Sequence, residues 1–130
     1  MEMMKMMNNI LRPGTIVCAC YGDFDCEKRV GIFCVLYDEQ LDGMLNNNNV
    51  TAIKITTSMR GAMNYSVPIF KDKEPFLEQD CYALCSKVHT LSKKQTYKVL
   101  GVLSKNSMFQ IYKIYNKYSR SMLTQIENYI

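Results

Sequence analysis

The stretch from Ile53 to Gly61, with the sequence IKITTSMRG, gathers three hydroxyl side chains, an arginine and a glycine. It begins with the apolar–polar alternation that is typical of a strand, and it ends in residues that are common in turns. Hydroxyls beside a cation can also donate hydrogen bonds to a phosphate. The residue types alone leave two interpretations open: ordinary turn chemistry, or a pocket for a phosphate group.

His89 is the only histidine of the chain, and its side chain is the only one whose ordinary pKa, near about 6.5, suits proton transfer at neutral pH. A single histidine on a strand is more often structural than catalytic, so both roles stay open. The six cysteines have the spacings C-x-C and C-x-x-x-C, which match no strong zinc pattern, and the chain shows no secretion signal. We therefore expect reduced thiols, no bound metal and no other cofactor.

The net charge of +4 is unevenly distributed along the chain. Residues 1–80 hold eight Lys and Arg against eleven Asp and Glu, a net charge of −3, whereas residues 81–130 hold eight against Glu127 alone, a net charge of +7. A basic C-terminal part favours a polyanionic partner, either nucleic acid or an acidic polypeptide. A solvated basic face is the alternative.

Short strands are the elements that would position these side chains. β-forming residues or period-two alternation predict strands at residues 15–21, 30–37, 50–57, 65–70 and 97–103, and either a strand pair or one bent strand at residues 81–91. The run at 30–37 is apolar throughout, which indicates a central strand. Pro68 favours an edge position for its strand, because proline cannot donate a hydrogen bond to a neighbour.

The last segment changes to a period of three and four, which indicates an amphipathic helix with Ser107 as its N-cap. Its apolar stripe, interpreted as core or dimer seam, consists of Met108, Ile111, Tyr115, Tyr118, Met122, Ile126 and Tyr129. Antiparallel strands followed by one long helix predict the α+β class with a small curled β-barrel.

The length of 130 residues favours a single domain. We expect residues 1–12 to be a flexible N-terminal leader and residues 13–130 to form the folded domain. The longest apolar run, at 30–37, is too short to cross a bilayer, so we expect no membrane contact and a location in the cytoplasm.

Four pieces of the sequence occur in an order that resembles the MazF/PemK family of type II toxin–antitoxin systems. They are GTIV at 14–17 (family G-D-I-V), RVGIFCVL at 29–36 (family R-P-x-L-V-I), ITTS at 55–58 (family I/C-T-T/S) and YALCSKVHTL at 82–91 (family V-x-L-x-D/E-Q-V-R-T/S-I). Each piece alone is a weak signal. Their succession at suitable spacing, with a C-terminal helix after them, carries the resemblance over residues 13–130.

The resemblance implies an SH3-like antiparallel β-barrel that forms a homodimer. It also implies a sequence-selective, metal-independent endoribonuclease that cleaves single-stranded RNA, mRNA in particular, and thereby inhibits growth. In this family the arginine that opens the second strand and the threonine that ends the third face each other at the cleavage site, and here these positions are Arg29 and Thr56. An acidic antitoxin that covers the RNA groove is the implied protein partner, in agreement with the basic C-terminal part.

Cleavage without a metal uses the 2′-hydroxyl of the RNA as nucleophile, so the protein must help to remove its proton and stabilise the charge on the phosphorane. Arg29 offers a planar fork to two phosphate oxygens, and Thr56 offers a hydroxyl. His89, at the basic position of the family's V-R-T, is the third candidate catalytic residue. Side chains expected to hold the RNA backbone or to stack its bases are Lys28, Thr57, Ser58, Arg60, Lys87, Tyr21 and Phe24, with Lys54 as a further cation.

Three features differ from the family pattern. Val30 and Gly31 replace the proline after the arginine, the first loop is shorter, and Ser86 and Lys87 replace an acidic–Gln pair whose acidic residue takes part in catalysis or fixes the arginine in some members. These differences favour, as the alternative, a non-catalytic member of the fold that binds a protein partner such as gyrase, or binds nucleic acid without cutting it. The Asn-, Lys-, Ile- and Tyr-rich composition leaves a third alternative, a structural or regulatory protein of a mobile element.

Overall fold

The computed structural model describes residues 10–21, 29–42, 48–58 and 64–129. Strands fill most of these ranges, and one long helix follows them. The elements in chain order are β1 (Thr15–Tyr21), β2 (Arg29–Asp38), the 3-10 helix η1 (Glu39–Asp42), β3 (Asn49–Thr56), β4 (Ser66–Ile69), β5 (Cys81–Ser92), the 3-10 helix η3 (Lys93–Gln95), β6 (Thr96–Val102) and α2 (Lys105–Tyr129).

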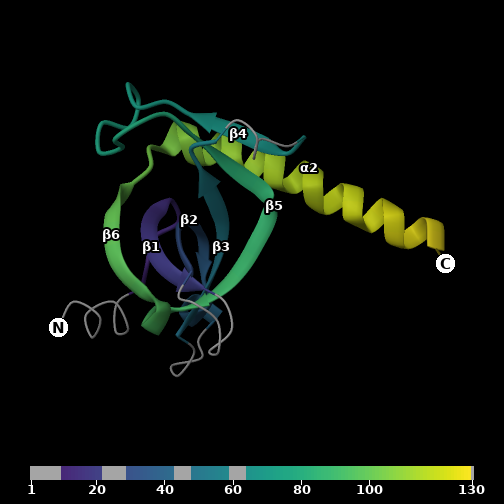
Figure 1. The fold of residues 1–130 in the computed structure, drawn as a ribbon. Helices are drawn as coiled ribbons and strands as arrows, with labels where there is room; N and C mark the ends of the chain where they lie inside the picture. Colours follow the sequence, from purple (N-terminus) through teal and green to yellow (C-terminus); the bar gives the residue numbers. More distant parts are fainter. Residues whose placement is uncertain (1–9, 22–28, 43–47, 59–63, 130) are drawn as a thin grey trace.

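The strands form one six-stranded sheet in the order β4-β5-β3-β2-β1-β6, and all neighbours are antiparallel. Figure 1 shows β6 and β5 at the two sides of a curled sheet, β1, β2 and β3 between them, and α2 across one end. The sheet is not closed, since β4 and β6 form its edges. The predicted SH3-like barrel with a long C-terminal helix is confirmed, as are the central position of residues 30–37 and the edge position of the strand with Pro68.

Residues 81–91 belong to a single bent strand rather than a strand pair. Ile53 of β3 pairs with Val88 of β5, but the next residue, Lys54, pairs with Leu84, so one step along β3 passes residues 85–87 of β5. Such a bulge bends a strand and increases its twist. The bend allows β5 to pair with both β4 and β3 in its first half and to continue along β3 in its second half.

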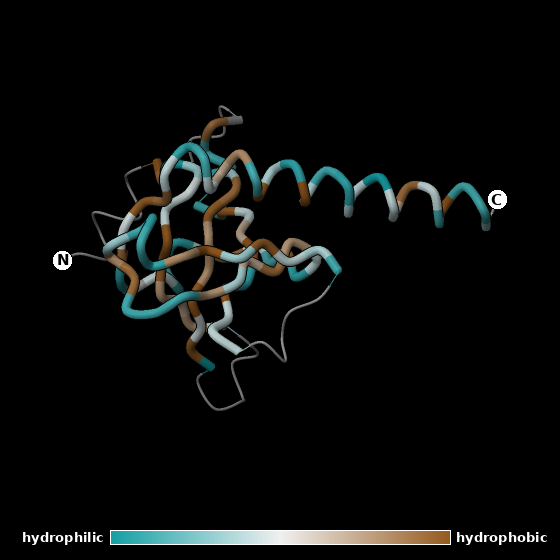
Figure 2. The backbone as a smooth tube through the Cα atoms, turned by 90° about the horizontal axis from the view of Figure 1, so that it is seen from above, coloured by the Kyte–Doolittle hydropathy of each residue, from teal (hydrophilic) through white to brown (hydrophobic). Residues whose placement is uncertain are grey.

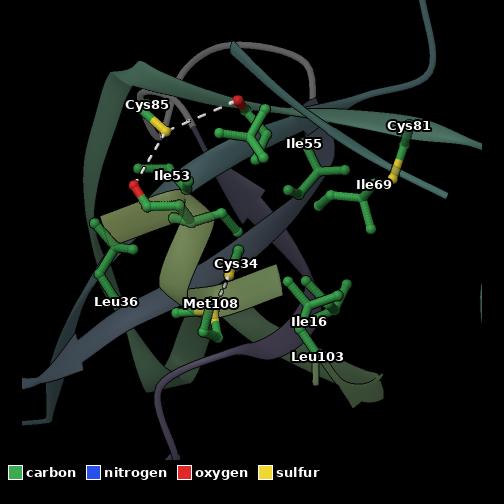
Figure 3. Packing of buried hydrophobic residues seen from close by; sticks show 13 residues of the cluster. Ile16, Cys34, Leu36, Ile53, Ile55, Ile69, Cys81, Cys85, Leu103 and Met108 are labelled. Carbon is green, nitrogen blue, oxygen red and sulfur yellow. Dashed lines mark hydrogen bonds between the residues drawn. The ribbon is translucent and has the colours of Figure 1, made fainter. Parts of the chain in front are cut away.

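One face of the sheet packs against α2, in a buried cluster that contains Cys34, Cys85, Met108 and Ile111 (Figure 3). The Cys34 thiol donates to the Met108 sulfur at 3.8 Å, and the Cys85 thiol donates to the Ile111 carbonyl oxygen at 3.7 Å. Burial is the main cause that raises the pKa of Cys34 to about 12. Burial also raises the pKa of Cys85, to about 11, so both thiols stay protonated and act as small core residues.

The opposite face holds a second buried cluster, to which Tyr21 adds its ring. Its members are Leu11, Val17, Ala19, Phe33, Val35, Val50, Ala52 and Leu91. Val50 and Ala52 have no exposed surface, so the face of β3 that carries Lys54 and Thr56 is polar only at its end.

Leu11 lies in the predicted leader, yet it is buried and its backbone N–H donates to the Asp38 carboxylate at 2.7 Å. Contact with the barrel thus begins two residues before the predicted boundary at residue 13. Residues 1–9 lie outside the described residues.

A buried ion pair fixes the end of β2 to η3. The Lys93 ammonium lies 2.7 Å from the Asp38 carboxylate, and neither side chain has exposed surface. The backbone N–H of Gln40 donates to the same carboxylate at 3.0 Å, and its side-chain oxygen accepts from Lys93 at 3.0 Å. Such a pair tolerates burial only when further hydrogen bonds satisfy its atoms, as they do here.

Helix α2 begins at Lys105, so the prediction of Ser107 as its N-cap is wrong. The residue before the helix, Ser104, accepts the backbone N–H of Ser107 on its Oγ at 3.3 Å, and its own N–H donates to the buried carboxylate of Glu74 at 2.9 Å. The Ser107 hydroxyl donates to the same carboxylate at 2.9 Å. A carboxylate at a helix N-terminus is favoured by the helix dipole, and Glu74 lies thirty residues before Ser104, beyond the range of a local sequence signal.

The first half of α2 packs on the barrel and the second half projects away from it (Figures 1 and 2). Met108 and Ile111 are buried, whereas Met122, Leu123 and Ile126 are exposed. The predicted apolar stripe is therefore core only in its first part. Among the residues that the structure describes, no helix combines the length and the apolar character needed to span a membrane.

Candidate functional site

The candidate residues Arg29 and Thr56 lie at the same end of the sheet. The register pairs Tyr21 with Arg29 across β1 and β2, and Ile32 with Ile55 across β2 and β3. If the pairing of β2 with β3 continues by one step, Thr56 lies opposite Gly31. Arg29 then lies two residues, or about 7 Å, further along β2. An arginine side chain is long enough to bridge this separation.

Side-chain alternation places these two residues on one face. Arg29 shares a face with Gly31 and Phe33, and Thr56 shares a face with Lys54. Because Lys54 contacts the Phe33 ring, the two faces are the same one. We call this surface, formed by Tyr21, Arg29, Lys54, Thr56 and His89, the strand-end face.

Lys54 lies at the centre of the strand-end face. Its ammonium donates to the Tyr21 hydroxyl at 3.2 Å and lies 4.4 Å from the centre of the Tyr21 ring and 5.0 Å from that of Phe33. In the described part of the chain, no carboxylate lies within ion-pair distance of Lys54. Aromatic faces stabilise an ammonium without neutralising it, so this charge is held in place for an anion.

Gly31 makes room for that lysine. A Cβ at this position would collide with the Lys54 ammonium and lie 3.0 Å from Cε1 of Tyr21. A glycine within a strand often marks such a close approach. The departure of this chain from the family pattern after Arg29 therefore has a local structural reason.

His89 completes the face from β5, where it pairs with Ala52 of β3. Its ring lies 5.1 Å from the Phe33 ring and 5.9 Å from the Tyr21 ring, both in edge-to-face geometry. Burial lowers the pKa of His89 below the ordinary value of 6.5, and the positive charges of Lys54 and Lys87 lower this pKa further. The imidazole is therefore neutral at pH 7, the form that can accept a proton.

Thr56 answers the question raised by the IKITTSMRG stretch. Its hydroxyl oxygen accepts the backbone N–H of Ser58 at 3.2 Å, a turn in which a threonine bonds the backbone two residues further on. The hydroxyl keeps its own proton, which it can donate to another acceptor. In the described part of the stretch, residues 53–58, this local turn orients the Thr56 hydroxyl at the end of β3.

The other predicted binding residues fall into four groups. Tyr21 lies within the strand-end face, and Thr57 and Ser58 follow β3 directly. Lys87 is exposed in the bulge of β5 and influences the pKa of His89. The remaining three lie outside the described residues: Phe24, Lys28 and Arg60.

Sequence reasoning gave Lys54 only a minor place and missed Phe33 and Gly31. Phe33 looked like one residue of an apolar run, and its contact with Lys54 depends on the pairing of β2 with β3. The glycine inside a strand was the one available signal for a close approach.

The chemistry of the face follows from its residue types. In the described part of the chain, no three His, Cys, Asp or Glu side chains gather so as to hold a metal ion. The strand-end face offers two cations, a hydroxyl donor and a neutral imidazole. These groups can bind a phosphodiester and accept a proton.

Solved structures with a similar fold include MazF toxins. MazE-MazF from Deinococcus radiodurans gives a TM-score of 0.65 at 11% identity, over 85% of this chain and 96% of that one. The Mycobacterium tuberculosis toxin MazF-mt6 gives a TM-score of 0.61 at 22% identity, over 82% of this chain and 94% of that one. An endoribonuclease in complex with its cognate antitoxin, from a mycobacterial species, gives a TM-score of 0.60 at 16% identity. The match covers 80% of this chain and 89% of that one. At such identities the likeness establishes the fold.

The family model for the PemK-like, MazF-like toxin of type II toxin–antitoxin systems matches residues 32–117. The match spans more than half of the chain, and the chain belongs to this family, as the order of its four sequence pieces predicts. No curated protein sequence matches it.

Proposed function

We propose that the protein is a sequence-selective, metal-independent endoribonuclease that cleaves single-stranded RNA, mRNA in particular, on the strand-end face. The observation that carries this proposal is the Lys54 ammonium that lies over the rings of Tyr21 and Phe33, on the same face as Arg29 and a neutral His89. Membership of the toxin family supports it.

Four residues of the strand-end face have a part in the proposed reaction. His89 accepts the proton of the 2′-hydroxyl as the 2′-oxygen attacks phosphorus. Arg29 and Lys54 stabilise the negative charge on the non-bridging oxygens, and Thr56 donates a hydrogen bond to one of them. The bond to the 5′-oxygen breaks, this oxygen takes a proton from the solvent, and a 2′,3′-cyclic phosphate remains.

The proposal includes a homodimer and an acidic antitoxin as partners, acting in the cytoplasm. The net charge of +7 on residues 81–130 suits an acidic polypeptide, and two of the similar solved structures contain a toxin with its antitoxin. The exposed apolar residues on the second half of α2 supply a surface for the second copy.

A non-catalytic binding protein is the second candidate function. The observation that favours it is that, among the described residues, no carboxylate lies within ion-pair distance of Lys54, together with Ser86 and Lys87 at the family's acidic–Gln pair. The face would then grip a phosphate backbone, or a protein such as gyrase, without cutting.

Incubation of the purified protein with a long single-stranded RNA in EDTA separates the two functions. The nuclease cuts the RNA at a small set of sites and leaves cyclic phosphate ends. A binding protein retards the intact RNA on a native gel, and that result would overturn the proposed cleavage.

A further inference from the structure

A groove of about 490 Å³ adjoins the strand-end face, and Lys54 and Thr56 of that face are among its lining residues. Its apolar walls come from five strands and the segment before β5: Cys18, Val30, Ile32, Ile55, Phe76, Leu77, Cys81 and Leu100. This volume lies within the range of roughly 300–1,000 Å³ that is common for small-molecule sites. The groove is large enough for a flat heterocycle.

Phe76 is a fixed wall of the groove. Its ring lies against Gly101 of β6, where a Cβ would meet three ring carbons at 2.5–2.7 Å. The glycine thus allows the ring to pack directly on the β6 backbone. A held aromatic ring is the kind of surface on which a nucleobase stacks.

The polar residues among those that line the groove form its polar rim. They are Lys54, Thr56 and Thr57, and, from the segment before β5, Glu78 and Gln79. Apolar walls with a few polar groups at the opening suit a ligand with a flat apolar body and a hydrogen-bonding edge. A sugar would need polar walls, and an aliphatic chain would leave the rim unused.

We propose that this groove binds one nucleobase next to the scissile phosphate, and that Glu78 selects bases with an exocyclic amino group. The position of that base relative to the cut rests on the proposed function. An ionised carboxylate only accepts hydrogen bonds, so it pairs with the amino group of cytosine or adenine and opposes the carbonyl oxygens of uracil. Gln79, which can donate and accept, serves the remaining edge of the base.

Binding of oligodeoxynucleotides tests this proposal without any cleavage, because they lack the 2′-hydroxyl. We expect the wild type to bind oligo(dA) and oligo(dC) about tenfold more tightly than oligo(dU) in fluorescence anisotropy. Glu78→Gln should reduce this preference to less than about threefold, since the amide now also donates. Asp72→Asn is the matched control: it removes one charge from the same exposed segment, outside the groove, and should keep the wild-type preference.

Equal binding of the three oligomers by the wild type, or an unchanged preference in Glu78→Gln, would overturn the proposal. The outcome is separate from that of the cleavage test. A protein that leaves RNA intact in EDTA but loses its base preference in Glu78→Gln is not a nuclease, yet it uses the groove for a nucleobase. In a protein that does cut, Glu78→Gln should shift the base found beside the cut sites.

Discussion

At the residue scale, the candidate site depends on a lysine ammonium that lies over two aromatic rings. The Lys54 ammonium lies 4.4 Å from the centre of the Tyr21 ring and 5.0 Å from that of Phe33, and it donates to the Tyr21 hydroxyl. Its charge opposes protonation of His89 on the same face. The cation and the base are therefore coupled, and a change in one is measurable at the other.

The pKa of His89 should lie below 6.5, and Lys54→Met should raise it, because one of the opposing charges is removed. As the chain has a single histidine, its ring signals in an NMR titration report this pKa without ambiguity. Gly31→Ala should have the same effect, since the new Cβ pushes the lysine ammonium away. Lys94→Met, a control on η3, should leave the titration unchanged, and a pKa at or above 6.5 in the wild type would contradict this account.

The lowered pKa of His89 also determines how the free energy of unfolding depends on pH. The folded state binds the His89 proton more weakly than the unfolded chain, so unfolding becomes easier as the pH falls below 6.5 toward the folded pKa. Above pH 6.5 His89 contributes no pH dependence. His89→Gln should remove the contribution of His89 to the pH dependence of the free energy of unfolding. Urea unfolding at pH values from 7.5 to 5 measures this contribution.

Arg29, Thr56 and His89 could be proposed from the sequence because each occupies a motif position. The central place of Lys54 could not, because it requires β1, β2 and β3 to bring Tyr21, Phe33 and Lys54 together in register. Glu78 and Phe76 gave no signal either, since they lie in a charged segment whose contact with β6 is a tertiary feature.

At the element scale, the buried pair of Asp38 and Lys93 fixes β2 to the turn between β5 and β6. Asp38→Asn should lower the free energy of unfolding by about 3–5 kcal/mol, because it leaves a buried ammonium without its counter-charge. Urea unfolding followed by circular dichroism measures this loss.

Two further variants sharpen that measurement. Asp72→Asn, at an exposed position, should change the free energy of unfolding by less than about 0.5 kcal/mol. The double variant Asp38→Leu with Lys93→Met should recover much of the loss, since an apolar pair replaces the ion pair without an unpaired charge. If Asp38→Asn were as stable as the wild type, the ion pair would not hold these elements together.

Alternation and residue type predicted all the strands of the sheet, because strands such as β1, β3 and β4 have one buried face and β2 has two. The N-terminal end of α2 was placed wrongly, because the carboxylate that caps it comes from Glu74, far away in the sequence. The sequence did not decide whether residues 81–91 form one bent strand or a strand pair, because the bend depends on how β3 pairs with each half of β5.

At the scale of the whole molecule, α2 extends beyond the barrel with its apolar residues exposed (Figure 2). We predict that this part forms the seam of a homodimer, with twice the 15.1 kDa mass of one chain in light scattering. Leu123→Glu with Ile126→Glu should yield a monomer, because charges replace the apolar contact. Gln125→Glu with Asn128→Glu adds the same charge to exposed polar positions of the helix and should leave the dimer intact.

A monomeric wild type, or a dimer that survives the first pair of substitutions, would exclude this seam. The stripe itself was visible in the sequence, but not which part of it the barrel covers. The division follows from the position of the sheet along α2, where Met108 and Ile111 reach the core and later turns do not.

The central claim is that Arg29 takes part in RNA cleavage on the strand-end face. The most direct test is the cleavage rate of a long single-stranded RNA in EDTA, compared between the wild type, Arg29→Ala and Arg12→Ala. Arg12 is an exposed arginine before β1, at the opposite end of that strand from the residue that pairs with Arg29. We predict cutting by the wild type and Arg12→Ala, and a rate about 10²–10³-fold lower for Arg29→Ala. Equal rates for all three proteins would contradict the assignment.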